Sequence, residues 1–373
     1  MDISGKVIEH RRWLHKNPEL AFEEFKTSEY IRRHLDDFGI PYRKVGTGTI
    51  ADLNVGSNQT IALRADMDAL PITEINDKPY KSQIEGKMHA CGHDAHTAML
   101  LTAAEYMVKE KRPSKNVRFI FQPAEEGGCG ACEMVKAGSV DGVDMVFGIH
   151  VWVGTKSGKF SSKSGPLMAG IDELTLSVKG IGGHAASPHQ TVNPISIGAT
   201  IVNELYKIRS LRIDPLENAV INVTAFNSGN TFNVVPTEAK IFGTIRTFSD
   251  VTRKDVISNV ENMKDLAHSL GGDVDLNLKR IAPPVVNSKE GFDEAVKVIK
   301  KLGFEFEEAV PTMGSEDFAY YLQKVKGAFL FLGIRSESKH VIAPHHSPYF
   351  DVDEEALQSG VKFFLGIAGS MYT

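Results

Sequence analysis

The feature of the sequence that most constrains the fold is a dense group of metal-binding side chains. Residues 89–96 read His-Ala-Cys-Gly-His-Asp-Ala-His. Thiolate and imidazole are good ligands for first-row divalent ions, and Gly92 allows a tight turn between Cys91 and His93. A helix-forming run follows over 97–111, so the group is predicted to lie where a loop enters a helix. Because a solvated helix cap needs only one Ser or Asp, this set indicates a site.

Length, charge and composition limit the class of protein. The chain has 373 residues, of which 42% are hydrophobic and 24% charged, as expected for about two globular domains. The formal net charge of -5 offers no basic field for nucleic acid. We see no signal-peptide core in residues 1–12 and no membrane-spanning apolar run. We therefore expect a cytoplasmic protein with no nucleic-acid or membrane partner, and its three cysteines are too few for a disulfide framework.

Two carboxylates lie near the end of a predicted strand. Strand-like apolar runs stand at 48–55 and 60–70, and the second contains Asp66 and Asp68 near its end, whose side chains point to the same face of a strand. At the carboxyl end of a strand, they could face the metal-binding group. A salt bridge to Arg64 is an equally good interpretation of this segment taken alone.

Two further strands carry side chains suited to the same site. The run 116–121 leads into Glu125 and Glu126, which could serve as general base and metal ligand. Without a metal nearby, the pair would be read as an acidic turn. The strand predicted over 143–153 contains His150. Strands that alternate with helices and carry polar residues at their carboxyl ends indicate an α/β sheet with its site along that edge.

The pattern of the chain changes over residues 170–282. Alternating strand-like segments and two helical stretches, 193–209 and 250–269, predict a small α+β domain with two helices on one face of an antiparallel sheet. The alternation of the first part then resumes. We therefore predict one domain of residues 1–169 and 283–373, interrupted by the insertion.

Other candidate residues lie in the insertion and near the end of the chain. His184 stands in a glycine-rich turn, and Arg246 could bind a substrate carboxylate near Asn233. A turn asparagine and a surface arginine are the alternatives for Asn233 and Arg246. The pair His345 and His346 could close the metal site.

Cys129 and Cys132 form a Cys-x-x-Cys pair in front of a short helix that runs through 134–137. There is no second such pair and no thioredoxin-like context. We expect the two sulfurs to act as small apolar groups, with a redox or metal role as the alternative.

Together, these motifs resemble the amidohydrolase branch of the aminoacylase and carboxypeptidase family. That branch includes hippurate hydrolases, N-acetyldiaminopimelate deacetylases and auxin-conjugate hydrolases. The matching motifs occur in the family's order and stand at residues 64–71, 88–100, 121–127, 148–150, 182–189, 233–236 and 346–350. They cover nearly the whole chain.

The resemblance implies a zinc-peptidase-like catalytic domain, with a mixed sheet flanked by helices, that holds two divalent metals. It also implies that the insertion is a lid that dimerises. The implied metal ligands are Cys91, His93, Glu126, His150 and His346. Cys91 stands where carboxypeptidase-like relatives have a bridging aspartate, and Asp66 where they have a ligand histidine. A thiolate favours zinc, with cobalt, manganese or nickel as alternatives.

The remaining roles also follow from the resemblance. Glu125 matches the general base and Asp68 an aspartate that orients a ligand. His184 matches a lid histidine that reaches the neighbouring subunit's site to polarise the scissile carbonyl. Asn233 and Arg246 match substrate-binding positions, and a homodimer or higher homo-oligomer is implied.

The implied activity is metal-dependent hydrolysis of the amide bond of N-acyl amino acids. A metal-activated water attacks the carbonyl, and Glu125 accepts its proton. A metallocarboxypeptidase or dipeptidase that cuts short peptides with the same site is the alternative. A noncatalytic binding protein is a weaker alternative, because the complete set of candidate ligands is present together with Glu125.

Overall fold

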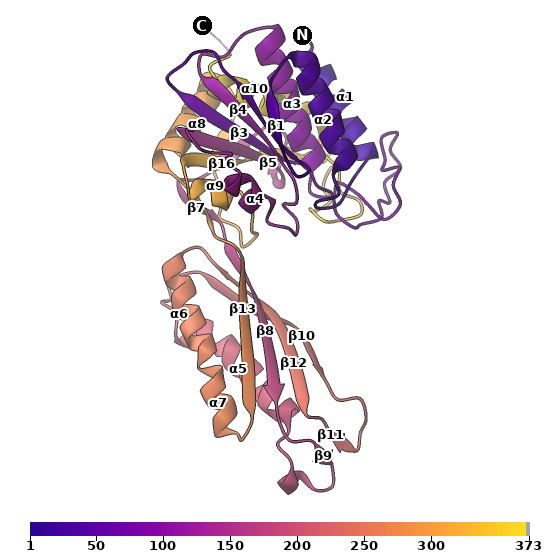
Figure 1. Cartoon of the computed structure of the whole chain (residues 1–373), viewed down its shortest axis with the longest axis vertical. Helices are drawn as coiled ribbons and strands as arrows, with labels where there is room; N and C mark the ends of the chain where they lie inside the picture. The colour runs from indigo at the N-terminus through magenta and orange to yellow at the C-terminus, as the bar shows by residue number, and fades with distance from the viewer. Residues whose placement is uncertain (371–373) are drawn as a thin grey trace. The chain divides into compact units, whose positions relative to one another are not determined.

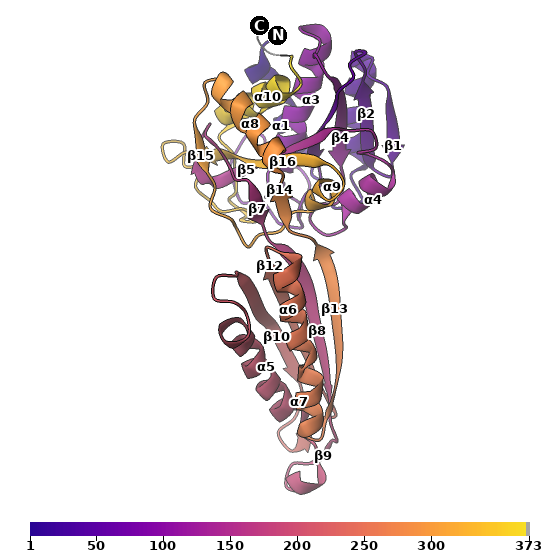
Figure 2. The same cartoon turned by 90° about the vertical axis from the view of Figure 1, so that its left-hand side faces the viewer.

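The computed structural model describes residues 1–370, which divide into two compact units. The first, unit 1, consists of residues 1–167, 286–310 and 317–370, and the second, unit 2, of residues 168–285 and 311–316. The short segment 311–316 belongs to unit 2, although the sequence did not indicate this. Figures 1 and 2 show the elements of each unit.

Unit 1 is built on an eight-stranded mixed sheet with the order β1-β2-β4-β3-β5-β16-β6-β15. Its strands are β1 (Tyr42–Val45), β2 (Gly48–Leu53), β3 (Thr60–Asp66), β4 (Asn116–Gln122), β5 (Met145–Lys156), β6 (Phe160–Ser162), β15 (Phe306–Glu308) and β16 (Lys326–Arg335). The four central strands β4, β3, β5 and β16 run parallel to one another. β1, β2 and β6 each have antiparallel pairing. The predicted mixed α/β sheet is confirmed.

Helices flank this sheet on both faces (Figures 1 and 2). Residues of α1 (Ile3–Lys16), α2 (Phe25–Phe38), α3 (His93–Lys109), α8 (Lys289–Lys301) and α10 (Glu354–Ile367) enter one hydrophobic core with the sheet. The short helices α4 (Gly130–Lys136) and α9 (Ala319–Leu322) pack against each other, with no residue in that core. The central strands are apolar on both faces because helices cover both.

Local sequence signals set the ends of the first two helices. The side chain of Asp2 caps α1 by accepting a hydrogen bond from the N–H of Gly5 at 3.0 Å. Helix α1 ends at Asn17, immediately before Pro18, which cannot continue the hydrogen-bond ladder. Helix α2 ends at Gly39, whose φ of 69° is the left-handed conformation that terminates many helices.

Unit 2 holds a four-stranded antiparallel sheet with the order β10-β12-β8-β13. Its strands are β8 (Gly170–Lys179), β10 (Ala219–Ser228), β12 (Glu238–Thr247) and β13 (Asp273–Ala282), and its helices are α5 (Pro194–Leu211), α6 (Asp250–Glu261) and α7 (Met263–Ser269). The sheet and the helices share a second hydrophobic core. The single helix predicted over 250–269 is divided at Asn262, a residue that favours helix ends over helix interiors.

Short elements complete the chain. In unit 2, β9 (Gly183–His184) pairs with β11 (Val234–Val235), and a 3-10 turn η1 (Pro188–Gln190) follows β9. Where the chain leaves and re-enters unit 1, β7 (Gly165–Met168) pairs with β14 (Val285–Asn287).

None of the helices within residues 1–370 is both long enough and apolar enough to cross a membrane. The expected cytoplasmic location stays a prediction.

Candidate active site and metal centre

The candidate site lies at the carboxyl ends of the central parallel strands of unit 1. Asp66 ends β3 in register with Gln122, the last residue of β4. Because the two strands run in the same direction, the segments that follow them leave the sheet at one edge. His150 lies on the neighbouring strand β5, and α3 begins at His93 beside them. Four segments far apart in sequence therefore meet at one place.

Five candidate ligands form two groups that share one sulfur. The donor atoms of Cys91, His93 and His150 lie within 4.8 Å of one another, and so do those of Cys91, Glu126 and His346. Metal–ligand bonds to nitrogen, oxygen and sulfur are about 2.0 to 2.3 Å long, so donors around one ion are a few ångströms apart. Cys91 is therefore common to the two groups, whose sulfur, nitrogen and oxygen donors could hold divalent ions.

Asp68 orients two of these candidate ligands. The Nδ1 atom of His93 lies 2.9 Å from the main-chain oxygen of Asp68 and 3.2 Å from its Oδ1 atom. The other carboxylate oxygen of Asp68 accepts a hydrogen bond from the N–H of Glu126 at 3.0 Å. With its proton on Nδ1, His93 presents the Nε2 lone pair to the group, as metal-binding histidines do.

The surroundings of His93 and Cys91 fit a bound cation. The His93 Nε2 atom is buried and, among the described residues, has no hydrogen-bond partner. Burial alone would lower the pKa of His93, but Asp66 and Asp68 outweigh it and raise the pKa to about 10. Burial, Glu126 and Glu125 raise the pKa of the Cys91 thiol well above its usual value. A divalent cation would offset this negative charge and take up both donor atoms.

A bend after β4 turns Glu125 and Glu126 toward the same group. Ala124 has a φ of 53°, and a turn follows, so the two glutamates are not held on opposite sides of an extended strand. Their carboxylates lie with His93 in a third group of donor atoms within 4.8 Å. Glu126 Oε1 is 3.2 Å from His346 Nε2, whereas Glu125 Oε2 is 4.0 Å from His93 Nε2. The two glutamates therefore occupy different places at the site.

The structure distinguishes His346 from its neighbour His345. His346 has a φ of 64°, which turns its side chain to Glu126 and Cys91. His345 is half-buried, with its ring stacked on Trp152 and its Nε2 atom accepting a hydrogen bond from the N–H of Val153 at 3.4 Å. Only His346 of this pair belongs to one of the donor groups among the described residues.

His96 and Asp66 lie beside the candidate ligands and satisfy each other. His96 Nδ1 is 2.6 Å from Asp66 Oδ1, and His96 Nε2 accepts a hydrogen bond from the N–H of Val151 at 2.8 Å. Both ring nitrogens of His96 are therefore in use within the protein. Arg64, His93 and His96 hold the pKa of Asp66 well below its usual range against the opposing effect of burial. The His96–Asp66 pair thus lies next to the candidate ligands and supports their position.

In unit 2, the structure brings His184 and Asn233 together. β9 pairs with β11 so that His184 lies opposite Val234, and the N–H of Ala185 donates to the main-chain oxygen of Asn233 at 3.1 Å. The exposed His184 ring accepts a hydrogen bond from the N–H of Ala186 on Nδ1, which leaves its proton on Nε2.

Arg246 does not join His184 and Asn233. It lies near the end of β12, opposite Ile171, whereas the other end of that strand, Glu238, pairs with Lys179 shortly before β9. Eight residues of strand separate Arg246 from Glu238, about 26 Å at 3.3 Å per residue. The half-buried Arg246 donates to the main-chain oxygen of Met313 at 2.8 Å and makes no ion pair with another described residue.

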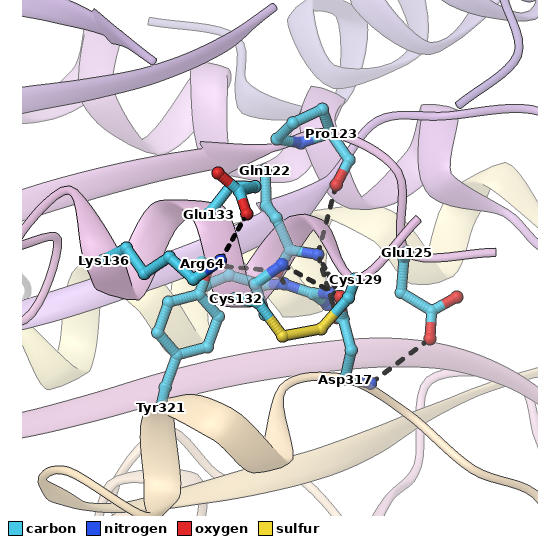
Figure 3. Close-up of a disulfide and its surroundings, with 11 residues drawn as sticks. Arg64, Gln122, Pro123, Glu125, Cys129, Cys132, Glu133, Lys136, Asp317 and Tyr321 are labelled. Atoms are coloured by element: carbon cyan, nitrogen blue, oxygen red, sulfur yellow. Dashed lines mark hydrogen bonds and ion pairs between the residues drawn. A yellow bond between two sulfur atoms is a disulfide. The ribbon is translucent and has the colours of Figure 1, made fainter. Parts of the chain in front are cut away.

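The sequence did not predict a buried polar network beside Glu125 (Figure 3). Arg64 donates to Gln122 at 2.8 Å and to Asp317 at 3.0 Å, and Gln122 donates to Asp317 at 2.8 Å. The N–H of Asp317 in turn donates to Glu125 Oε1 at 3.4 Å. Burial raises the pKa of Asp317 to about 6 although Arg64 opposes the shift. An arginine and a glutamine within apolar strands were the available sequence signals.

A second buried ionic cluster lies at the start of α3. Asp94 accepts hydrogen bonds from Arg11 Nε at 2.9 Å and from His15 Nδ1 at 2.8 Å. Arg11 also pairs with Asp351 at 2.9 Å. Burial opposes ionisation of Asp94, but Arg11 and His15 lower its pKa far below the usual range. This cluster joins α1 to α3, which carries the first candidate ligands.

The expectation for Cys129 and Cys132 is wrong in one respect. The two residues open α4 as predicted, with Cys129 at its N-cap, but their sulfurs form a disulfide. Cys91 is a free thiol. Spacing alone could not decide between a disulfide and two apolar thiols.

Comparison with known proteins agrees with this geometry. Residues 62–370 match the model of "Peptidase family M20/M25/M40". The chain belongs to this family. It is 40% identical to thermostable carboxypeptidase 2 of Saccharolobus solfataricus, over 96% of this chain and 93% of that one. It is 36% identical to N-acetylcysteine deacetylase of Bacillus subtilis, over 97% and 96%.

The fold of the M20 family is also shared. A Bacillus subtilis protein described as a dinuclear metal-binding peptidase from the M20 family matches with a TM-score of 0.87 and 33% identity, over 98% of both chains. The resemblance inferred from the motifs is confirmed. As an M20 family member with this donor set, the chain is a metal-dependent amidohydrolase.

Proposed function

We propose that this enzyme hydrolyses the amide bond of N-acyl amino acids at the carboxyl ends of β3, β4 and β5. The convergence of five metal-binding side chains, with the Glu125 carboxylate beside them, is the observation that supports this proposal most directly. The similarity to an N-acetylcysteine deacetylase favours an N-acyl amino acid as the substrate class.

In this proposal, the two groups that share Cys91 would hold two divalent ions, with zinc as the preferred metal. Their ligands are Cys91, His93, Glu126, His150 and His346. When bound, such ions lower the pKa of a coordinated water and polarise a carbonyl. Asp68 holds His93 and Glu126 in place, since it contacts both.

Glu125 acts as the general base. Its carboxylate is mostly shielded, with 11% of the side chain exposed, and it faces the donor group at 4.0 Å from His93 Nε2. Glu125 takes a proton from the attacking water and returns it to the nitrogen of the leaving amine. Asp317 supports this position through its N–H.

The residues of unit 2 bind and polarise the substrate. His184 Nε2–H donates to the carbonyl oxygen as negative charge develops on it. Arg246 binds the free carboxylate of the amino acid, for which its guanidinium has no competing ion pair among the described residues, and Asn233 adds a hydrogen bond.

The separation within unit 2 supports a dimer. Arg246 lies about 26 Å of strand away from the end that leads to His184. A small N-acyl amino acid is too short to contact both side chains of one chain. We therefore propose that His184 and Arg246 at each site come from two different subunits, and that unit 2 is a lid and dimerisation domain on the catalytic unit 1.

Replacing Glu125 with Gln tests the proposal. Glu125→Gln keeps the shape of the side chain and should keep the metal content, while kcat falls about 100- to 10,000-fold because general base catalysis is lost. Glu133→Gln is the matched control, since Glu133 is exposed on α4 and its carboxylate pairs with Lys136. Near-normal turnover of Glu125→Gln would remove this residue from the role.

A carboxypeptidase is the second candidate function, because a thermostable carboxypeptidase is among the similar proteins. The chemistry at Glu125 is the same, and Arg246 would bind the terminal carboxylate of a peptide. Measuring the release of free amine from N-acetyl, N-benzoyl and dipeptide substrates distinguishes the two candidate functions. A higher kcat/KM on dipeptides than on N-acyl amino acids would favour the second candidate.

A further inference from the structure

A disulfide lies next to the segment that carries the proposed general base. Glu125 and Glu126 are followed by two glycines and then by Cys129, which is bonded to Cys132 in the first turn of α4 (Figure 3). Both cysteines are partly exposed, so reductants in solution can reach them. Neither cysteine belongs to a donor group among the described residues. The metal-site chemistry therefore leaves this sulfur pair without a function.

The disulfide closes the first turn of α4, directly after the segment that holds Glu125 and Glu126. Cys129 has a φ of 54°, a conformation that residues with a Cβ atom rarely adopt. The N–H of Cys132 donates to the main-chain oxygen of Cys129 at 3.0 Å, and the N–H of Gly130 donates back to that of Ala124 at 3.0 Å. The segment that holds both glutamates is thus bounded by Ala124 and Cys129, which are both in the left-handed region.

Hydrogen bonds connect the disulfide-closed turn to Glu125. Ala131 lies between the two cysteines, and its N–H donates to Asp317 Oδ2 at 2.9 Å. The N–H of Asp317 donates to Glu125 Oε1 at 3.4 Å. Figure 3 shows the disulfide, Asp317 and Glu125 side by side. A change in the turn at Ala131 therefore reaches the proposed general base through one residue.

We propose that Cys129 and Cys132 form a reversible dithiol–disulfide switch that controls hydrolysis by positioning Glu125. In the reduction, a dithiol donates two electrons and two protons. Its own sulfurs become a disulfide, the Cys129–Cys132 bond breaks, and two thiols form; a disulfide reagent reverses the step. This proposal rests on the function proposed for Glu125.

The oxidised form is the active one. Reduction removes the covalent closure of the turn, frees Cys129 to leave its left-handed conformation, and leaves the adjacent Gly127 and Gly128 with more conformational freedom. The Ala131 N–H then no longer holds Asp317 in one place. Misplacement of a catalytic group by about 1 Å can cost up to about 100-fold in rate. We expect reduction to lower kcat about tenfold, with KM little changed.

The test equilibrates the metal-loaded enzyme in glutathione buffers of increasing reducing strength. In each buffer, alkylation and mass spectrometry measure the thiol state of Cys129 and Cys132, and the initial rate on an N-acyl amino acid measures activity. Metal content is measured in parallel because thiols also bind metals. We expect the rate to follow the disulfide fraction, and the double variant Cys129→Ser/Cys132→Ser to have the low rate in every buffer.

The double variant also serves as the control for the third cysteine. Cys91 is the only cysteine left in it, so a remaining redox response would assign the effect to Cys91 and overturn the proposal. An equal rate of the fully oxidised and fully reduced wild type would overturn it too, and so would failure of the disulfide to form in oxidising buffer.

A second measurement keeps this proposal separate from the proposed function. Hydrogen exchange of the Ala131 amide should be faster in the reduced form, because its bond to Asp317 depends on the closed turn. If no substrate is hydrolysed in either form, the proposed function fails. Hydrogen exchange of the Ala131 amide then shows by itself whether the turn responds to reduction. Equal exchange in the two forms would show that the disulfide does not control this segment.

Discussion

Asparagine at position 68 is expected to weaken metal binding without unfolding the chain. Asp68 is 1% exposed and accepts two hydrogen bonds through its carboxylate, from His93 Nδ1 and from the N–H of Glu126. An asparagine of the same shape has one oxygen and one NH2 group. Whichever way the amide is turned, one donor then faces another donor, and either His93 or Glu126 loses its support.

The expected size of this effect follows from the position of Asp68. Loss of a group that orients a metal ligand typically costs 10- to 100-fold in metal affinity, which corresponds to about 1.4 to 2.8 kcal/mol of binding free energy. Because the main-chain oxygen of Asp68 still lies 2.9 Å from His93 Nδ1, we expect the lower part of this range if the amide oxygen faces Glu126.

The assay is competition between the protein and a chromophoric chelator for zinc, with circular dichroism to verify folding. Asp52→Asn is the matched control, because Asp52 lies on the same sheet, is 45% exposed and pairs with Arg118 far from the donor groups. Zinc affinity of Asp68→Asn within twofold of the wild type would refute the reasoning that Asp68 holds two ligands.

Three further predictions follow from the geometry. Asp94→Asn should lower the free energy of unfolding by about 3 to 5 kcal/mol in urea, because it removes the negative charge that pairs with the buried Arg11 guanidinium. Since the pKa of Asp94 is lowered on folding, its contribution is present above the unfolded value of about 3.9 and is lost as the pH falls further. The wild type should therefore lose more stability than this variant on acidification, and equal losses would exclude the assignment. Mixing His184→Ala with Glu125→Gln subunits should restore about one quarter of wild-type activity, since half of the dimers are mixed and each has one intact site; no recovery after proven subunit exchange would place His184 at its own subunit's site. Arg246→Lys should raise KM about tenfold and change kcat less, as loss of a paired charged hydrogen bond implies, and an unchanged KM would remove Arg246 from substrate binding.

The sequence predicted the parts of the fold that depend on local patterns. Apolar runs that end in polar residues identified β3, β4 and β5. These signals are local, because hydrophobic periodicity and turn residues act over a few positions. The candidate site residues at one edge of the sheet could be proposed for the same reason, because they stand in motifs at the ends of these strands.

The features that the sequence did not predict depend on contacts between distant segments of the chain. Arg64 donates a hydrogen bond to Asp317, 253 positions later in the chain. No local sequence pattern around either residue indicates that the two are in contact. The disulfide depends on how the chain turns into α4. Such features arise from tertiary packing, which single-sequence patterns do not record.

The most direct test of the central claim is elemental analysis of the purified enzyme, paired with amine release from an N-acyl amino acid before and after chelation. The proposed pair of donor groups predicts close to two zinc-like ions per chain, as in other two-metal hydrolases. It also predicts hydrolysis that disappears on chelation and returns with zinc or cobalt. Hydrolysis that continues at full rate in metal-free enzyme, or a chain that binds no metal after reconstitution, would contradict the account.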